Sequence, residues 1–127
     1  MKKNKLTQIW LDKAEEDLLY AKIALKETKI YGLLCFHCQQ ATEKLLKFYL
    51  TMTGIKFRKT HILPELLILC IKADENFNQF KESVLILDKY YIEPRYSESL
   101  EVYSKKEAQQ AIRFVEEIKK FIFRKLK

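Results

Sequence analysis

The stretch from Cys35 to Lys44 places thiol, imidazole, amide and amine groups close together in the sequence. His37, Gln40 and Lys44 are spaced by three and four residues, so a helix would align them as one polar strip. Such a strip could line a cleft in which Lys44 holds a phosphate group. The same spacing also fits an outer face that only meets solvent, and both interpretations stay open.

Asp17, His61 and Arg95 could join this strip, because none of them has an obvious partner in its own segment. An inward carboxylate is costly unless a cation meets it, and the planar guanidinium of Arg95 suits a carboxylate or a phosphate. We therefore expect Arg95 to reach Asp17 or Glu43. Glu43 lies one residue beyond the strip and is also placed to pair with Lys47.

His61 has two interpretations. It could serve as a general acid or base near neutral pH, or it could cap or pack at the start of a helix. As a ribonuclease group, His61 would need a cation to hold the phosphate in the transition state. Arg58, Lys59 and Arg95 could each supply this cation, and the sequence does not choose among them.

Cys35 and Cys38 have the spacing of a metal or redox pair. A structural zinc site would need a second pair, and a redox cysteine would lie at a helix start, where the dipole lowers the thiol pKa. Neither condition is met, so we expect packed thiols, no metal and no cofactor. An odd number of cysteines and the lack of a secretion signal predict a reducing, cytoplasmic location.

The composition of the 127 residues predicts a single all-α domain, residues 1–127. Hydrophobic residues make up 48% of the chain, and two glycines and two prolines leave few places for sharp turns. The longest apolar run, from Leu66 to Ile71, is far shorter than the roughly twenty residues that cross a bilayer, so no membrane contact is expected. The net charge of +7 favours polyanionic partners such as RNA, although the excess gathers partly at the chain ends.

Apolar periodicity predicts an up-and-down bundle of four to five helices. The expected helices cover about 6–28, 31–52, 64–71, 77–91 and the stretch from Ser104 nearly to the end of the chain. Gly54 should end the second helix, and Ser104 and Glu107 form a capping-box pattern. On the last helix, Glu116 and Glu117 are expected to pair with Lys120, Lys119 or neighbours on the outer face.

The order of these motifs resembles the HEPN family of small helical domains. The motifs are Glu15-Glu16-Asp17, Gln39-Gln40-Ala41-Thr42-Glu43-Lys44, Lys59-Thr60-His61 and Glu93-Pro94-Arg95-Tyr96, and the resemblance runs from about Trp10 to the last helix. It implies a helical bundle, commonly a homodimer, in a family with many ribonuclease toxins and RNA-processing modules. Catalytic members carry an arginine and a histidine that are separated by four to six residues. Here Arg58 precedes His61 with only two intervening residues, so that motif is missing.

The chain is more similar to a branch with a Gln-Gln-Ala-x-Glu-Lys helix, a Lys-Thr-His step and an Arg-Tyr loop. Members of this branch often accompany a minimal nucleotidyltransferase in a two-gene toxin–antitoxin-like module. The resemblance implies a non-catalytic protein that binds a nucleotide, RNA or the partner nucleotidyltransferase. The matching positions are Gln40, Glu43, Lys44, His61, Arg95 and Tyr96, supported by Asp17 and His37.

Two alternatives remain open at this stage. The first is a metal-independent ribonuclease in which Lys56 or Arg95 replaces the usual arginine and His61 is the general acid or base. Lys56 has the required spacing from His61, but a point-charge ammonium is a poor replacement for a bidentate guanidinium. The second is a structural helical adaptor that uses the polar strip as a dimer interface.

Overall fold

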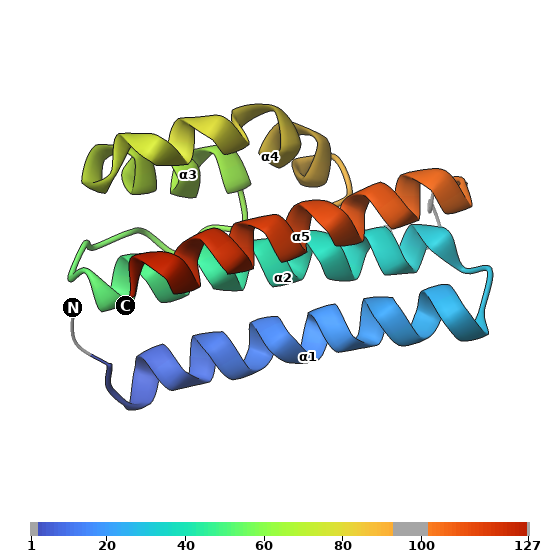
Figure 1. Cartoon of the computed structure of the whole chain (residues 1–127), viewed down its shortest axis with the longest axis horizontal. Coiled ribbons are helices and arrows are strands. Elements are labelled where there is room, and N and C mark those ends of the chain that lie inside the picture. The colour runs from blue at the N-terminus through green and yellow to red at the C-terminus, as the bar shows by residue number, and fades with distance from the viewer. Residues whose placement is uncertain (1–2, 93–101, 127) are drawn as a thin grey trace.

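Three helices of more than 20 residues, α1, α2 and α5, form the body of the fold. Shorter helices cover one side of them (Figure 1). The computed structural model describes residues 3–92 and 102–126. Its elements are α1 (Lys5–Glu27), α2 (Tyr31–Met52), α3 (Leu63–Ala73), the 3-10 helix η1 (Glu75–Phe80), α4 (Lys81–Asp88) and α5 (Lys105–Lys125). The predicted all-α helical bundle is confirmed, and the described residues contain no strand.

Helix α2 lies at the centre of the bundle, in contact with α1, α3, α4 and α5. It buries 14 of its 22 residues, whereas α1 buries 5 of its 23. This difference follows from the sequence, since α2 is apolar on most sides and α1 on only one. No helix in the described ranges is long and apolar enough to cross a membrane.

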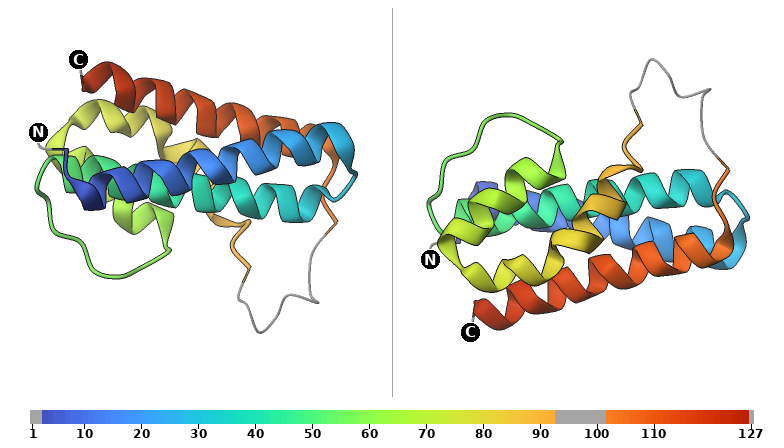
Figure 2. Two further views of the ribbon diagram at one scale, coloured as in Figure 1. Left: turned by 90° about the horizontal axis from the view of Figure 1, so that it is seen from below. Right: turned by 90° about the horizontal axis from the view of Figure 1, so that it is seen from above.

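The connection through residues 53–62 returns along the bundle before α3 begins (Figure 2). Because of this return, α3 runs in the same direction as α2, and α4 then runs back. Gly54, with a φ of 73°, follows the end of α2 and adopts the left-handed conformation that glycine tolerates best. The return places His61 at the start of α3, beside the middle of α2.

The start of α5 follows the capping box that the sequence predicts. The Ser104 hydroxyl accepts a hydrogen bond from the Glu107 backbone N–H at 3.1 Å, and the Glu107 carboxylate accepts one from the Ser104 N–H at 3.0 Å. A similar box that the sequence pattern did not reveal starts α1, where the Asn4 side chain and Thr7 bond each other's backbone N–H groups. These caps satisfy backbone donors that a helix start leaves free.

The predicted helix over 77–91 is wrong at both ends. Asp74 accepts a hydrogen bond from the Asn76 N–H and begins the tighter η1, which places Phe77 and Phe80 on the same, buried side. Helix α4 then ends at Asp88, whose carboxylate accepts a hydrogen bond from the Leu63 N–H at 2.9 Å. Asp88 therefore caps the start of α3, a contact between distant segments that periodicity does not reveal.

The predicted ion pairs within α5 are also not the ones observed. Glu116 bonds Lys22 at 2.8 Å, and Lys119 bonds Glu15 at 3.0 Å, so both pairs join α5 to α1. The physical reason is the packing of α5 against α1, which places opposite charges of the two helices within reach of each other. These partly exposed pairs contribute little to stability but fit the antiparallel arrangement.

Phe77 joins the outer layer to the long helices through ring contacts. Its ring centroid lies 4.7 Å from that of Tyr49 on α2 and 4.8 Å from that of Phe121 on α5. Phe80 adds a further edge contact to Phe121 at 5.2 Å. Phe77 is fully buried, so removal of its ring would leave a cavity in a close-packed core.

We predict that Phe77→Ala lowers the free energy of unfolding by about 3–5 kcal/mol, since it removes a buried ring and leaves a cavity. Urea unfolding followed by far-UV circular dichroism measures this loss. Leu85→Ala is the control, because Leu85 is exposed on α4 and should change stability by less than about 0.5 kcal/mol. Equal effects of the two substitutions would contradict the role assigned to Phe77.

Candidate functional site

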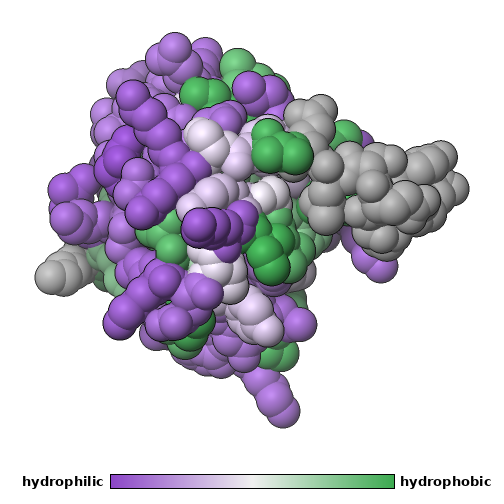
Figure 3. All heavy atoms as spheres, turned by 90° about the vertical axis from the view of Figure 1, so that its right-hand side faces the viewer, coloured by the Kyte–Doolittle hydropathy of each residue, from purple (hydrophilic) through white to green (hydrophobic). Residues whose placement is uncertain are grey.

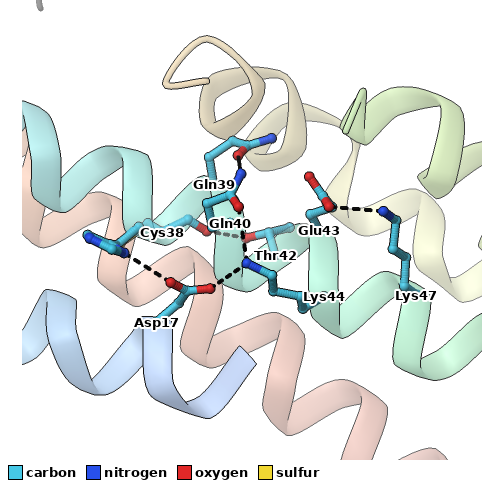
Figure 4. A network of polar contacts seen from close by, with 9 residues as sticks. Asp17, Cys38, Gln39, Gln40, Thr42, Glu43, Lys44 and Lys47 are labelled. Carbon is cyan, nitrogen blue, oxygen red and sulfur yellow. Dashed lines mark hydrogen bonds and ion pairs between the residues drawn. The ribbon is translucent and has the colours of Figure 1, made fainter. Parts of the chain in front are cut away.

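Asp17 on α1 faces α2, where it contacts Lys44 (Figure 4) and His37. Its Oδ2 atom accepts a hydrogen bond from Lys44 Nζ at 2.8 Å, and its Oδ1 atom lies 2.9 Å from His37 Nδ1. A carboxylate only accepts hydrogen bonds, so His37 Nδ1 must carry the proton and donate it. The sequence predicts that an inward Asp17 would meet a cation, and the cation that meets it in the described residues is Lys44.

The contacts continue from Lys44 along α2. Lys44 Nζ donates to Gln40 Oε1 at 3.0 Å, Gln40 Nε2 donates to Gln39 Oε1 at 2.8 Å, and Gln39 Nε2 donates to the His61 carbonyl at 3.0 Å. We call this set the polar network: Asp17, His37, Lys44, Gln40, Gln39 and the His61 carbonyl. It links α1, α2 and the connection before α3.

Burial and neighbouring charges act in opposite directions on Asp17. Burial raises the pKa of the Asp17 carboxyl, whereas the hydrogen bonds and charges of His37 and Lys44 lower it. The lowering effects prevail, and the pKa lies below its ordinary value of 3.8. Asp17 is therefore ionised at neutral pH, and its charge offsets that of Lys44 within the network.

Aromatic rings run alongside the polar network and form a second set of contacts. The Tyr91 and His61 rings are stacked, with centroids 3.9 Å apart and planes 5° from parallel. Phe36 lies 6.2 Å from Tyr91 and 5.8 Å from His37, and Tyr20 stacks on His37 at 5.0 Å. We call these five residues the aromatic row. His61 and Tyr20 are its exposed members.

Glu43 and Lys47 form a separate ion pair. Lys47 Nζ bonds Glu43 Oε2 at 2.9 Å, and both side chains are buried, with 6% of the Lys47 surface and 10% of the Glu43 surface exposed. Lys47 Nζ also lies 5.1 Å from the Trp10 ring centroid and 5.9 Å from that of Phe57. The pair is the one that the sequence predicts, but its burial beneath aromatic rings is not. Glu43 thus belongs to the interior rather than to the polar network.

The remaining candidates have different surroundings. Lys56 is exposed in the connection between α2 and α3. Arg58 is engaged with Glu65 at 2.7 Å. Arg95 and Tyr96 lie outside the described residues, so the expected contact of Arg95 with Asp17 or Glu43 stays a prediction.

All three cysteines are buried and free. Burial raises the pKa of Cys35 and of Cys70 to about 12, and it also raises the pKa of Cys38. The thiols are therefore protonated at neutral pH and react slowly. Within residues 3–92 and 102–126, no group of three or more His, Cys, Asp or Glu side chains could hold a metal ion.

Sequence reasoning passed over several members of the site. Gln39 is fully buried and connects Gln40 to the His61 carbonyl, yet it was only the neighbour of a candidate. Tyr20 and Phe36 enter the site as rings beside His37. The one available signal was the pair of adjacent glutamines on an otherwise apolar helix, since a buried amide needs partners.

Comparison with known proteins finds a matching family and a similar sequence. A family model described as the HEPN domain matches residues 7–126. A Methanocaldococcus jannaschii protein named "Putative toxin MJ1304" is 30% identical in an alignment 129 residues long. The alignment covers 90% of this chain and 84% of the relative.

Two solved structures share the fold. The structure described as "ST0689, an archaeal HEPN homologue" has a TM-score of 0.75 and 27% identity, and the match covers 100% of both chains. The structure of TT1696 from Thermus thermophilus has a TM-score of 0.73 and 26% identity, over 94% of this chain and 97% of the other.

We predict that Asp17→Asn lowers the free energy of unfolding at pH 7 by about 1–3 kcal/mol, because the neutral amide has one oxygen for two donors and no charge to pair with Lys44. The folded-state pKa of Asp17 is lowered, so its stabilising effect is present above the ordinary value of 3.8 and is lost as the pH falls through the folded-state pKa. The difference between wild type and variant should therefore shrink in acid. Urea unfolding from pH 7 to pH 3 measures it, and a difference that stays constant would contradict the ion-pair account.

We also predict that Lys47→Met lowers the free energy of unfolding by about 3–5 kcal/mol, because Glu43 is left as an uncompensated buried charge. The double variant Glu43→Leu/Lys47→Met should recover most of this loss, since apolar side chains of similar size replace a buried pair at little cost. Thermal and urea unfolding of both variants test this prediction. Equal losses in the single and double variants would speak against the buried pair.

Proposed function

Because the chain belongs to the HEPN domain family, we propose that it is a non-catalytic HEPN protein that binds a nucleotide, either free or within RNA. It would act in a two-gene toxin–antitoxin-like module, as a cytoplasmic homodimer with a minimal nucleotidyltransferase as its partner. The similarity to a protein named as a toxin supports the proposed module. The motif order along the sequence supports the proposed partner.

The observation that carries this proposal is the stack of His61 on Tyr91. One face of the His61 ring is covered by Tyr91, and His61 as a residue is exposed. A nucleobase on the outer face of His61 would extend the stack, and stacking on an aromatic side chain contributes about 1–3 kcal/mol per base. Proteins recognise unstacked bases in this way without needing a groove in a duplex.

The polar network would hold His61 in place for this role. Gln39 bonds the backbone carbonyl of His61, so the position of the ring depends on the network and not only on Tyr91. Lys44 uses two of its three donors on Asp17 and Gln40, and the third could meet a phosphate. Arg95 and Tyr96 follow Tyr91 by four and five positions in the sequence, and their phosphate-binding and stacking roles are part of the proposal.

Charge pairing favours binding over cleavage. RNA cleavage with His61 as the acid or base would need an available cation close by to stabilise the transition-state phosphate. Arg58, the arginine nearest to His61 in the sequence, is paired with Glu65. Lys56 and Lys59 are exposed, and their ammonium groups are point charges that do not reproduce a bidentate guanidinium.

We predict that His61→Ala weakens binding of AMP and of short single-stranded RNA by roughly tenfold or more, because it removes the stacking face. His61→Phe should stay within about threefold of wild type, since it keeps an aromatic ring but cannot transfer a proton. Calorimetric titration of the purified protein without added metal measures both. Lys72→Ala, an exposed cation on α3, controls for a general loss of positive charge.

The same variants test the ribonuclease alternative. Mixed cellular RNA is incubated with each protein and its fragment lengths are followed over time. Cleavage by wild type that both His61→Ala and His61→Phe abolish would overturn the non-catalytic proposal and identify His61 as an acid–base group. Failure of the wild type to bind either AMP or RNA would contradict the nucleotide site itself.

A further inference from the structure

Exposed apolar side chains gather at two places among the described residues. One is the end of the bundle where α1 turns into α2, with Ile30, Leu33 and Val102 in a mostly hydrophilic surround (Figure 3). The other is α1, which exposes between 42% and 64% of each of Leu6, Ile9, Leu19, Tyr20 and Ile23. No other described helix leaves so many large apolar side chains uncovered.

The exposed face of α1 has a regular order. Leu6, Ile9, Lys13, Glu16, Tyr20 and Ile23 alternate in steps of three and four residues, and all six are exposed. We call these residues the α1 seam. Steps of three and four are the spacing that keeps side chains facing a neighbouring helix in a coiled coil. Apolar residues occupy both ends of the α1 seam, and a Lys–Glu pair occupies its middle.

The rest of the molecule does not cover the α1 seam. Helix α1 packs against α2 and α5 through its opposite side, which buries Thr7, Leu11, Ala14, Leu18 and Ala21. The left view in Figure 2 looks onto α1, which lies in front of the other helices. A second helix could therefore lie along it, at the usual interaxial distance of about 8–10 Å.

We propose that the α1 seam is the surface on which a second copy of this chain docks, with the two α1 helices antiparallel about a two-fold axis. A two-fold interface must be complementary to itself. Antiparallel pairing places Leu6 against the partner's Ile23 and Ile9 against the partner's Tyr20. It also places Lys13 against the partner's Glu16, so opposite charges meet at the centre, and each contact occurs twice.

The charges select this orientation over the alternative. A parallel pair would place Lys13 against the partner's Lys13 and Glu16 against the partner's Glu16, and like charges in a shared interface are unfavourable. An unrelated partner helix would need only apolar residues on the α1 seam. It would not account for an order of apolar ends and opposite central charges that matches its own reverse. The contact would extend over about 25 Å, from the helical rise of 1.5 Å per residue.

The homodimer is part of the proposed function, and the α1 seam is the surface proposed for it. The inference rests on the proposed function only through this homodimer. Tyr20 belongs to the α1 seam and also stacks on His37 of the aromatic row. Docking a second copy would cover the outer side of Tyr20. The interface would therefore adjoin the polar network without using the stack of His61 on Tyr91.

Sedimentation equilibrium of the full chain without ligand tests the proposed surface. We expect wild type to be a dimer, Ile23→Asp to raise its dissociation constant at least tenfold, and Leu85→Asp, on the exposed side of α4, to leave it unchanged. Both substituted positions are exposed, so the monomer fold should persist in each variant. A monomeric wild type, or a dimer that Ile23→Asp leaves intact, would overturn the proposal.

Charge reversal tests the pairing at the centre of the seam. Lys13→Glu should weaken the dimer at least threefold, because it faces the partner's Glu16 with a like charge. The double variant Lys13→Glu/Glu16→Lys should restore the wild-type dissociation constant, since the opposite charges meet again. Equal weakening by the single and double variants would contradict this pairing.

Cross-linking tests the antiparallel orientation. A Leu6→Cys chain mixed with an Ile23→Cys chain under a mild thiol oxidant should form a disulfide-linked heterodimer, because the two positions face each other. Leu6→Cys alone should not link to itself, and the three native thiols are buried and slow to react. Self-linking of Leu6→Cys would indicate a parallel pair and refute the proposed geometry. Nucleotide binding is measured separately, so failure of the interface leaves the His61 site testable.

Discussion

The ion pair between Asp17 and Lys44, with His37 on the second carboxylate oxygen, is the contact on which the site depends. Asp17 and Lys44 each expose only 16% of their side chains, so either charge alone would be costly. Their pairing favours the observed position of α1 on α2, because a shift along either helix would separate the charges. A contact that joins these two helices is therefore also the start of the polar network.

The network transmits this constraint to a distant part of the chain. Gln40 and Gln39 relay hydrogen bonds from Lys44 to the carbonyl of His61, in the connection that precedes α3. His61 in turn stacks on Tyr91, which follows α4. The ring that we propose for nucleobase stacking is thus held from two sides, by an amide on α2 and by an aromatic neighbour.

The two buried ion pairs on α2 serve different purposes. Glu43 and Lys47 are covered by Trp10 and Phe57, and they join no other charge in the described structure. Asp17 and Lys44 lie beside the partly exposed His37 and connect to residues that reach solvent. Helix α1 contributes to both environments with its inner face. Its outer face carries the exposed residues of the α1 seam.

The sequence by itself determined the three long helices, the cap at Ser104, the polar strip of His37, Gln40 and Lys44, and the pair of Glu43 with Lys47. Each of these depends on spacing within one segment, where helix geometry alone decides which side chains are neighbours. The HEPN motifs were likewise readable as local patterns in a fixed order.

The tertiary structure alone decided which side chains from different segments meet. The partners of Asp17, the bond from Gln39 to the His61 carbonyl and the stack of His61 on Tyr91 all join distant segments. The same holds for Glu116, which pairs with Lys22 on α1 rather than within α5. Periodicity shows which side of each helix is buried. It does not show how far each helix is rotated and shifted against its neighbours, because the packing of the whole core sets that arrangement.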